Sequence, residues 1–135
     1  MLKQKIEAYG IKRLLHLPSY IRGEDLPTVY GLASVVVFPS VYEGFGLPVL
    51  VEMACGVPVI TFNVSSLPEV TGDAAVLVDH ASPEQLSDAM RAVLTSASLR
   101  ASLAERGRRR AQLNWGATAH VTLRVYERAY TQCHM

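Results

Sequence analysis

Short apolar runs alternate with longer amphipathic stretches along most of the chain. One run, at 34–38, holds three valines and a phenylalanine in succession, which is typical of a parallel strand covered on both faces. Four runs are short enough for strands and are bounded by turn-forming residues, at 14–17, 34–38, 58–62 and 74–79. The pattern predicts an α/β fold in which helices flank a parallel sheet, with the 34–38 strand central.

Helical periodicity fills the segments between and after these strands. Glycine follows two of the predicted helices, at Gly10 and Gly56, as is usual at helix C-termini. Ser82 suits the N-cap of the last helical region. The segment NVSSLPEVTGDA, at 63–74, is rich in turn-forming residues and is interpreted as a polar loop. The predicted helices are therefore residues 2–9, 24–33 and 47–55, followed by a helical tail at 82–132.

Composition limits the classes of function. A chain of 135 residues corresponds to a single domain, so we treat 1–135 as one unit. Its 13 basic and 12 acidic side chains give a net charge of +1, which disfavours nucleic acid as a partner. Cys55 and Cys133 form no CxxC pair, and the charged N-terminus resembles no secretory signal. We expect no transmembrane segment and a cytoplasmic location.

The loop after the 34–38 strand is the first candidate site. In open α/β sheets, ligands bind beyond the carboxyl ends of the strands. Gly44 and Gly46 allow a ligand to approach the backbone, and the start of the following helix suits a phosphate. Glu43 would repel that phosphate and is better suited to sugar hydroxyls. The plainer alternative is that the glycines only form the turn and Glu43 caps the helix.

A longer string carries a more specific signal. The segment FPSVYEGFGLPVLVEMACGVPVITFNVSSLPEV resembles the donor-lobe signature of the group 1, or family 4, retaining glycosyltransferases. The resemblance covers roughly residues 12–130 and includes GDAAVLVD and SPEQLSDAMRAVL in family order. It implies the C-terminal half of a GT-B enzyme, with a Rossmann-like parallel sheet that lacks its first strand. It also implies hexosyl transfer from a nucleotide diphosphate sugar to an acceptor hydroxyl, with retention.

The resemblance assigns roles to individual residues. Glu43 is the implied catalytic residue, which orients the sugar and favours positive charge at its anomeric carbon. Independently of the resemblance, Glu69 is a secondary candidate because it lies in the loop after the 58–62 strand, and an ordinary surface position is the plainer alternative. The implied substrate is the nucleotide sugar, with no cofactor and no metal, since there is no Asp-x-Asp pair. The implied binding residues are Gly44, Phe45 and Gly46 around the sugar, the Leu47 and Val49 N–H groups at the pyrophosphate, and Ser19, Tyr20 and Ile21 near the base.

The sequence departs from the family pattern in the proposed site. The family motif has a second glutamate eight positions after the first, where this chain has Val51, and Glu52 follows it. One helical step turns a side chain by about 100°. Glu52 is therefore a candidate replacement whose direction the sequence leaves open. No Lys or Arg occurs between Arg22 and Arg91, so only dipoles are available for the phosphate.

Two function hypotheses follow from these observations. The first is the donor-binding domain of a glycosyltransferase, inactive alone because the N-terminal Rossmann lobe is missing. The alternative is a catalytically incomplete nucleotide-binding or association module derived from that family. The family's first strand is absent from this chain, which leaves an open sheet edge where a second copy could pair to form a homodimer. A receiver-like or flavodoxin-like domain is disfavoured, because neither an acidic cluster nor a flavin loop is present.

Overall fold

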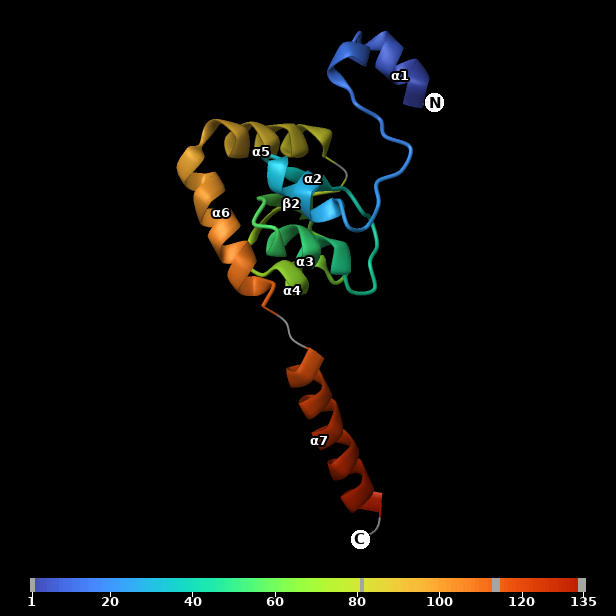
Figure 1. Ribbon diagram of the computed structural model, residues 1–135, viewed down its shortest axis with the longest axis vertical. Helices are drawn as coiled ribbons and strands as arrows, with labels where there is room; N and C mark the ends of the chain where they lie inside the picture. Colours follow the sequence, from blue (N-terminus) through green and yellow to red (C-terminus); the bar gives the residue numbers. More distant parts are fainter. Residues whose placement is uncertain (1, 81, 113–114, 134–135) are drawn as a thin grey trace.

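A parallel sheet of three strands lies at the centre of the molecule (Figure 1). The computed structural model describes residues 2–80, 82–112 and 115–133. The strand order is β1-β2-β3, and parallel pairing sets Val36 opposite Val59 and Ile60 opposite Val76. Three of the four predicted strands are thus confirmed, with the bounds β1 Val36–Phe38, β2 Val59–Phe62 and β3 Ala75–Val78.

Helices connect these strands and cover the sheet. The predicted helices at the N-terminus, before β1 and after the candidate loop are confirmed, and the tail divides into three helices. Gly10 and Gly56, with φ of 63° and 72°, end two of them in the left-handed conformation. The helices are α1 Leu2–Ala8, α2 Leu26–Leu32, α3 Leu47–Ala54, α4 Leu67–Thr71, α5 Pro83–Thr95, α6 Ala97–Arg110 and α7 Trp115–Cys133.

Two apolar clusters lie on opposite faces of β2. All four β2 residues are buried, and alternate side chains point to opposite faces. On one face Val59 joins residues of α3 and α4. On the other face Ile60 and Phe62 join Val93 of α5 and Leu103 of α6. Alternation along β2 therefore explains why helices cover both faces of the sheet.

The predicted strand at 14–17 is wrong. Lys12–Leu14 forms one turn of 3-10 helix, and residues 15–18 have no strand pairing. Leu14 and Leu17 are 82% and 64% exposed. A strand is stabilised by hydrogen bonds to a neighbour. The described residues supply no strand beside 14–17, so the backbone of this segment joins no ladder.

Two further expectations need correction. β2 is the central strand, and β1 is half-buried at the edge of the described sheet, because it pairs with β2 alone. The segment 63–74 is not merely a polar loop, since it contains α4. Leu67, Val70 and Thr71 of α4 are buried, so this short helix belongs to the core.

Two arginines of α6 contact α4 and the turn that follows it. Arg110 donates through Nε to the Val70 carbonyl at 2.8 Å, and Arg106 lies 3.5 Å from the Asp73 carboxylate.

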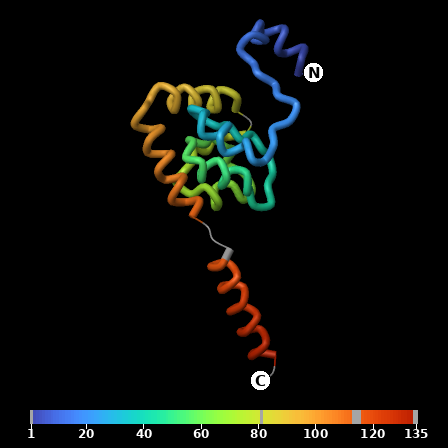
Figure 2. The backbone as a smooth tube through the Cα atoms, viewed as in Figure 1, coloured from blue at the N-terminus to red at the C-terminus, as the bar shows by residue number. Residues whose placement is uncertain are grey.

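Figure 2 shows α1 and α7 outside the layered body. Within the part of the chain that the structure describes, no helix combines the length and apolar character needed to span a bilayer.

Candidate functional site

The candidate site is the loop between β1 and α3. Thr61 of β2 donates a hydrogen bond to the Phe38 carbonyl at 2.8 Å, where β1 ends and the loop begins. The loop then runs through Glu43 and the two glycines to α3, beyond the carboxyl end of β1. In open α/β sheets, ligands bind at this end, beyond the carboxyl ends of the strands.

A serine orients the Glu43 carboxylate. Ser40, two residues after β1, lies 2.8 Å from Glu43 Oε1 and 3.1 Å from the Tyr42 carbonyl. The N-cap of α3, Gly46, makes no side-chain cap bond. Among the described residues, the Glu43 carboxylate contacts Ser40 and accepts from no N–H of α3, which does not support a capping role. A carboxylate has two oxygens, so Oε2 remains as an acceptor.

Gly46, at the start of α3, is buried against α4, and a Cβ at this position would lie 3.0 Å from the Leu67 side chain. Gly46 has φ of 98°, a conformation that side chains with a Cβ rarely adopt. Phe45 and Leu47 are about half exposed beside it, whereas the Val49 side chain is buried. The Val49 N–H donates to the Gly46 carbonyl at 3.1 Å, so this amide is engaged within the first turn.

Two serines at the start of α4 contact the same loop. Ser65 donates to the Glu43 carbonyl at 2.6 Å, and Ser66 lies 2.9 Å from that carbonyl and 3.0 Å from the Phe45 carbonyl. Ser40, Ser65 and Ser66 were not among the site residues predicted from the sequence. The available signals were a serine directly after the Phe38-Pro39 strand end and a serine pair before Leu-Pro-Glu.

Val51 and Glu52 lie on different faces of α3. Val51 is 45% exposed, whereas Glu52 is 2% exposed and its Oε2 has no hydrogen-bond partner among the described residues. Burial raises the pKa of Glu52 from 4.5 to about 7. Burial and then the Glu52 charge raise the pKa of Tyr30, so α2 lies near this carboxyl. The structure therefore does not bring Glu52 to the face that Val51 occupies.

The remaining predicted residues are not brought to the loop by any contact. Ser19 and Tyr20 are exposed and Ile21 is half-buried, and within 2–80 no hydrogen bond or ion pair joins them to the loop. Glu69 is exposed in the first turn of α4. Its backbone carbonyl accepts a hydrogen bond from Arg110. The base-binding and secondary-acid assignments stay predictions.

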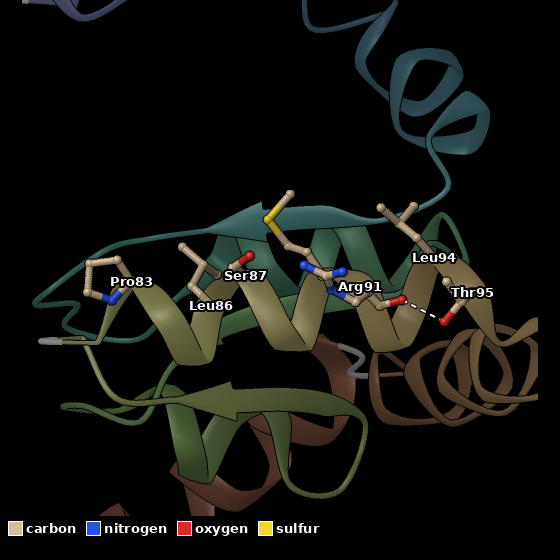
Figure 3. A pocket seen from close by; sticks show the side chains of 7 residues that line it. Pro83, Leu86, Ser87, Arg91, Leu94 and Thr95 are labelled. Atoms are coloured by element: carbon tan, nitrogen blue, oxygen red, sulfur yellow. Dashed lines mark hydrogen bonds between the residues drawn. The ribbon is translucent and has the colours of Figure 1, made fainter. Parts of the chain in front are cut away.

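A groove elsewhere on the surface holds none of the predicted site residues. Figure 3 shows it along α5, where Thr95 donates to the Arg91 carbonyl at 2.8 Å. The groove has no acid and no paired nucleophile and base. The groove is lined by Pro83, Leu86, Ser87, Met90, Arg91, Leu94 and Thr95.

Across residues 2–80, 82–112 and 115–133, no group of three potential metal ligands is found.

Comparison with known sequences gives a consistent family. Residues 1–110 match the family model described as glycosyl transferases group 1. The O-antigen chain mannosyltransferase B of Escherichia coli is 42% identical over 109 residues, covering 80% of this chain and 29% of that protein. The MMP alpha-(1->4)-mannosyltransferase of Mycolicibacterium hassiacum is 36% identical over 129 residues, covering 92% and 31%. The chain thus spans less than a third of the length of these relatives.

Comparison with solved structures agrees. Sucrose-phosphate synthase from Thermosynechococcus elongatus has a TM-score of 0.84 at 29% identity, covering 97% of this chain and 34% of that one. The C-terminal domain of a group 1 family protein, LpcC, from Francisella tularensis has a TM-score of 0.72 at 29% identity, covering 81% and 57%. The α/β fold matches the GT-B enzymes. With the family model and the sequence relatives in agreement, the chain belongs to the group 1 glycosyltransferases, in the region of their C-terminal domain.

Proposed function

We propose that this chain is the donor-binding part of a retaining hexosyltransferase, which takes its sugar from a nucleotide diphosphate sugar. The observation that carries the proposal is the loop from Ser40 to Gly46. It combines an oriented carboxylate and a left-handed glycine immediately before a helix N-terminus. Relatives named as mannosyltransferases support a hexose as the transferred group.

In this proposal each part of the loop has one task. Glu43 accepts hydrogen bonds from sugar hydroxyls through the oxygen that Ser40 leaves open, and its charge favours positive charge at the anomeric carbon. The backbone of Gly44–Gly46 surrounds the sugar. The helix dipole at Leu47 steadies the departing diphosphate. Neither a metal nor a further cofactor takes part, and the acceptor site belongs to the other lobe.

One observation favours the alternative of an association module. The position of the second family glutamate holds Val51, an exposed apolar side chain, while the neighbouring Glu52 is buried. The loss of a charge-assisted hydrogen bond to the ligand costs roughly 1.5–3 kcal/mol of binding free energy, which weakens binding about ten- to a hundredfold. A chain with this loss could keep the fold and associate with another protein or with a second copy of itself.

Ligand-observed NMR separates the two functions. The purified chain is titrated with UDP, GDP, ADP and their common sugar conjugates, and its oligomeric state is measured by light scattering. Selective binding of one conjugate is the expected result. If no compound binds at millimolar concentration and the chain forms a stable dimer, the association module is supported instead.

A further inference from the structure

The serine that begins α4 does not cap its own helix. Serine is favoured at the N-cap because its hydroxyl oxygen accepts from an N–H of the first turn. Ser82 and Ser96 do this at the starts of α5 and α6, accepting from Gln85 N and Leu99 N at 3.2 Å each. Ser66 occupies the same position in α4 and makes no such bond.

The Ser66 hydroxyl is used across the sequence instead, 21 and 23 residues away. It lies between the carbonyls of Phe45 and Glu43, and Ser65 donates to the Glu43 carbonyl as well. Each hydroxyl has one proton, and a carbonyl can accept two hydrogen bonds. Ser65 therefore serves Glu43, and the Ser66 proton is shared between Glu43 and Phe45.

The backbone around these serines is strained and anchored. Ser65 has φ of 55°, in the left-handed region, and Ser66 follows in the right-handed region with φ of −79°. This succession brings two adjacent hydroxyls to one carbonyl. At its other end, α4 is held by Arg110, which donates to the carbonyls of Glu69 and Val70. Strain of this kind persists only where surrounding contacts fix it.

The two accepting carbonyls determine the direction of two glycine amides. A trans peptide is planar, so its C=O and the next N–H point in opposite directions. The Glu43 carbonyl points to α4, and the Gly44 N–H consequently points away from α4. The same holds for Phe45 and Gly46. Among the described residues, neither glycine N–H donates a hydrogen bond.

We propose that Ser66, assisted by Ser65, is a positioning residue for the donor site. By fixing the carbonyls of Glu43 and Phe45, it sets the direction of the Gly44 and Gly46 amides, and the exposed Gly44 amide is the one presented to the ligand side of the loop. The role in donor binding rests on the function proposed above. The role in setting the loop does not, and it can be measured in the free chain.

The test uses the ¹⁵N resonances of Gly44 and Gly46 in the full chain. A hydrogen bond to a carbonyl polarises its whole peptide group, so it shifts the nitrogen of the following residue. Ser66→Ala is expected to shift both glycines by more than a linewidth, and Ser66→Thr to restore them. Ser65→Ala should shift Gly44 more than Gly46, because Ser65 contacts only the Glu43 carbonyl, whereas Ser66 contacts both carbonyls.

Ser82→Ala is the matched control for stability. It removes a working N-cap bond at α5 and should lower the unfolding midpoint without moving either glycine. Unchanged glycine resonances in Ser66→Ala, or equal shifts in Ser82→Ala, would overturn the proposal. Should Ser66→Ala fail to fold, Ser66→Cys, which replaces the hydroxyl with a weak thiol donor, is measured in its place, and unchanged Gly44 and Gly46 resonances there would overturn the proposal.

Donor affinity provides the second readout. For the nucleotide sugar that binds the wild-type chain, Ser66→Ala is expected to weaken binding about two- to tenfold. Equal affinity of Ser66→Ala and wild type would contradict the role in donor binding. If the wild-type chain binds none of the nucleotide sugars while the glycine shifts appear as expected, the proposed function fails and the loop-setting role of Ser66 stands.

Discussion

The buried Glu52 carboxyl predicts how the stability of the chain depends on pH. Burial raises its pKa to about 7 in the folded chain, against an ordinary value of 4.5. Between these values the folded chain binds more protons than the unfolded chain, so the free energy of unfolding falls as pH rises. Above about pH 7 the ionised Glu52 carboxylate lowers the free energy of unfolding by a constant amount. Below pH 4.5 the carboxyl is protonated in both the folded and the unfolded chain, and this loss of stability is absent. Glu52 therefore destabilises the fold at neutral and alkaline pH.

The size of the effect follows from the same two values. At about 1.4 kcal/mol for each pH unit, their difference sets an upper limit of about 3 kcal/mol. The variant Glu52→Gln is neutral at every pH and similar in size. We expect its unfolding free energy to exceed that of the wild type by about 2 kcal/mol at pH 8, and this difference to shrink as the pH approaches 4.5.

Urea unfolding followed by circular dichroism, at pH 5, 6, 7 and 8, measures this difference. Other titrating groups contribute equally to both proteins and cancel. Glu127→Gln, which removes an exposed carboxylate from α7, is the matched control. A difference between Glu52→Gln and wild type that stays constant from pH 5 to pH 8 would refute the reasoning, because a buried carboxyl that ionises on unfolding must produce a slope.

Two substitutions test the loop and α3 more locally. Val51→Glu places a carboxylate on the exposed face of α3, where the family motif has its second glutamate. It should tighten nucleotide-sugar binding about ten- to a hundredfold, and an unchanged Kd in the NMR titration would contradict a ligand contact at position 51. Gly46→Ala forces a Cβ into a left-handed position 3.0 Å from the Leu67 side chain, which should lower the free energy of unfolding by about 1–2 kcal/mol in urea. Gly44→Ala, with open space and no positive φ, should lower it by less, and equal losses would argue against the strain at Gly46.

The sequence pattern predicted the strands that have partners. The runs at 34–38, 58–62 and 74–79 are mostly apolar and contain β1, β2 and β3. The run at 14–17 carries the same signal, but pattern alone does not say whether a neighbouring strand exists. α4 was missed for the opposite reason: its polar flanks and Pro68 indicate a turn, while its burial depends on contacts with α3 and β2.

The site was predicted only where the motif is local. Glu43 and the glycines are contiguous, so their placement beyond β1 follows from the order of strand, loop and helix. The contact with Ser66 joins residues 23 positions apart, which no local pattern encodes. The exchange at Val51 and Glu52 is visible in the sequence, but which of the two side chains is buried depends on the face that α3 turns to its neighbours.

The most direct test of the donor-site account compares two ligands on two proteins. Wild type and Glu43→Ala are titrated by NMR with the nucleotide sugar that binds and with the matching nucleotide diphosphate, which has no sugar. If Glu43 contacts the sugar, the variant should bind the nucleotide sugar about ten- to a hundredfold more weakly and bind the diphosphate with unchanged Kd. Equal losses for both ligands, or no loss for either, would contradict the assignment of Glu43 to the transferred sugar.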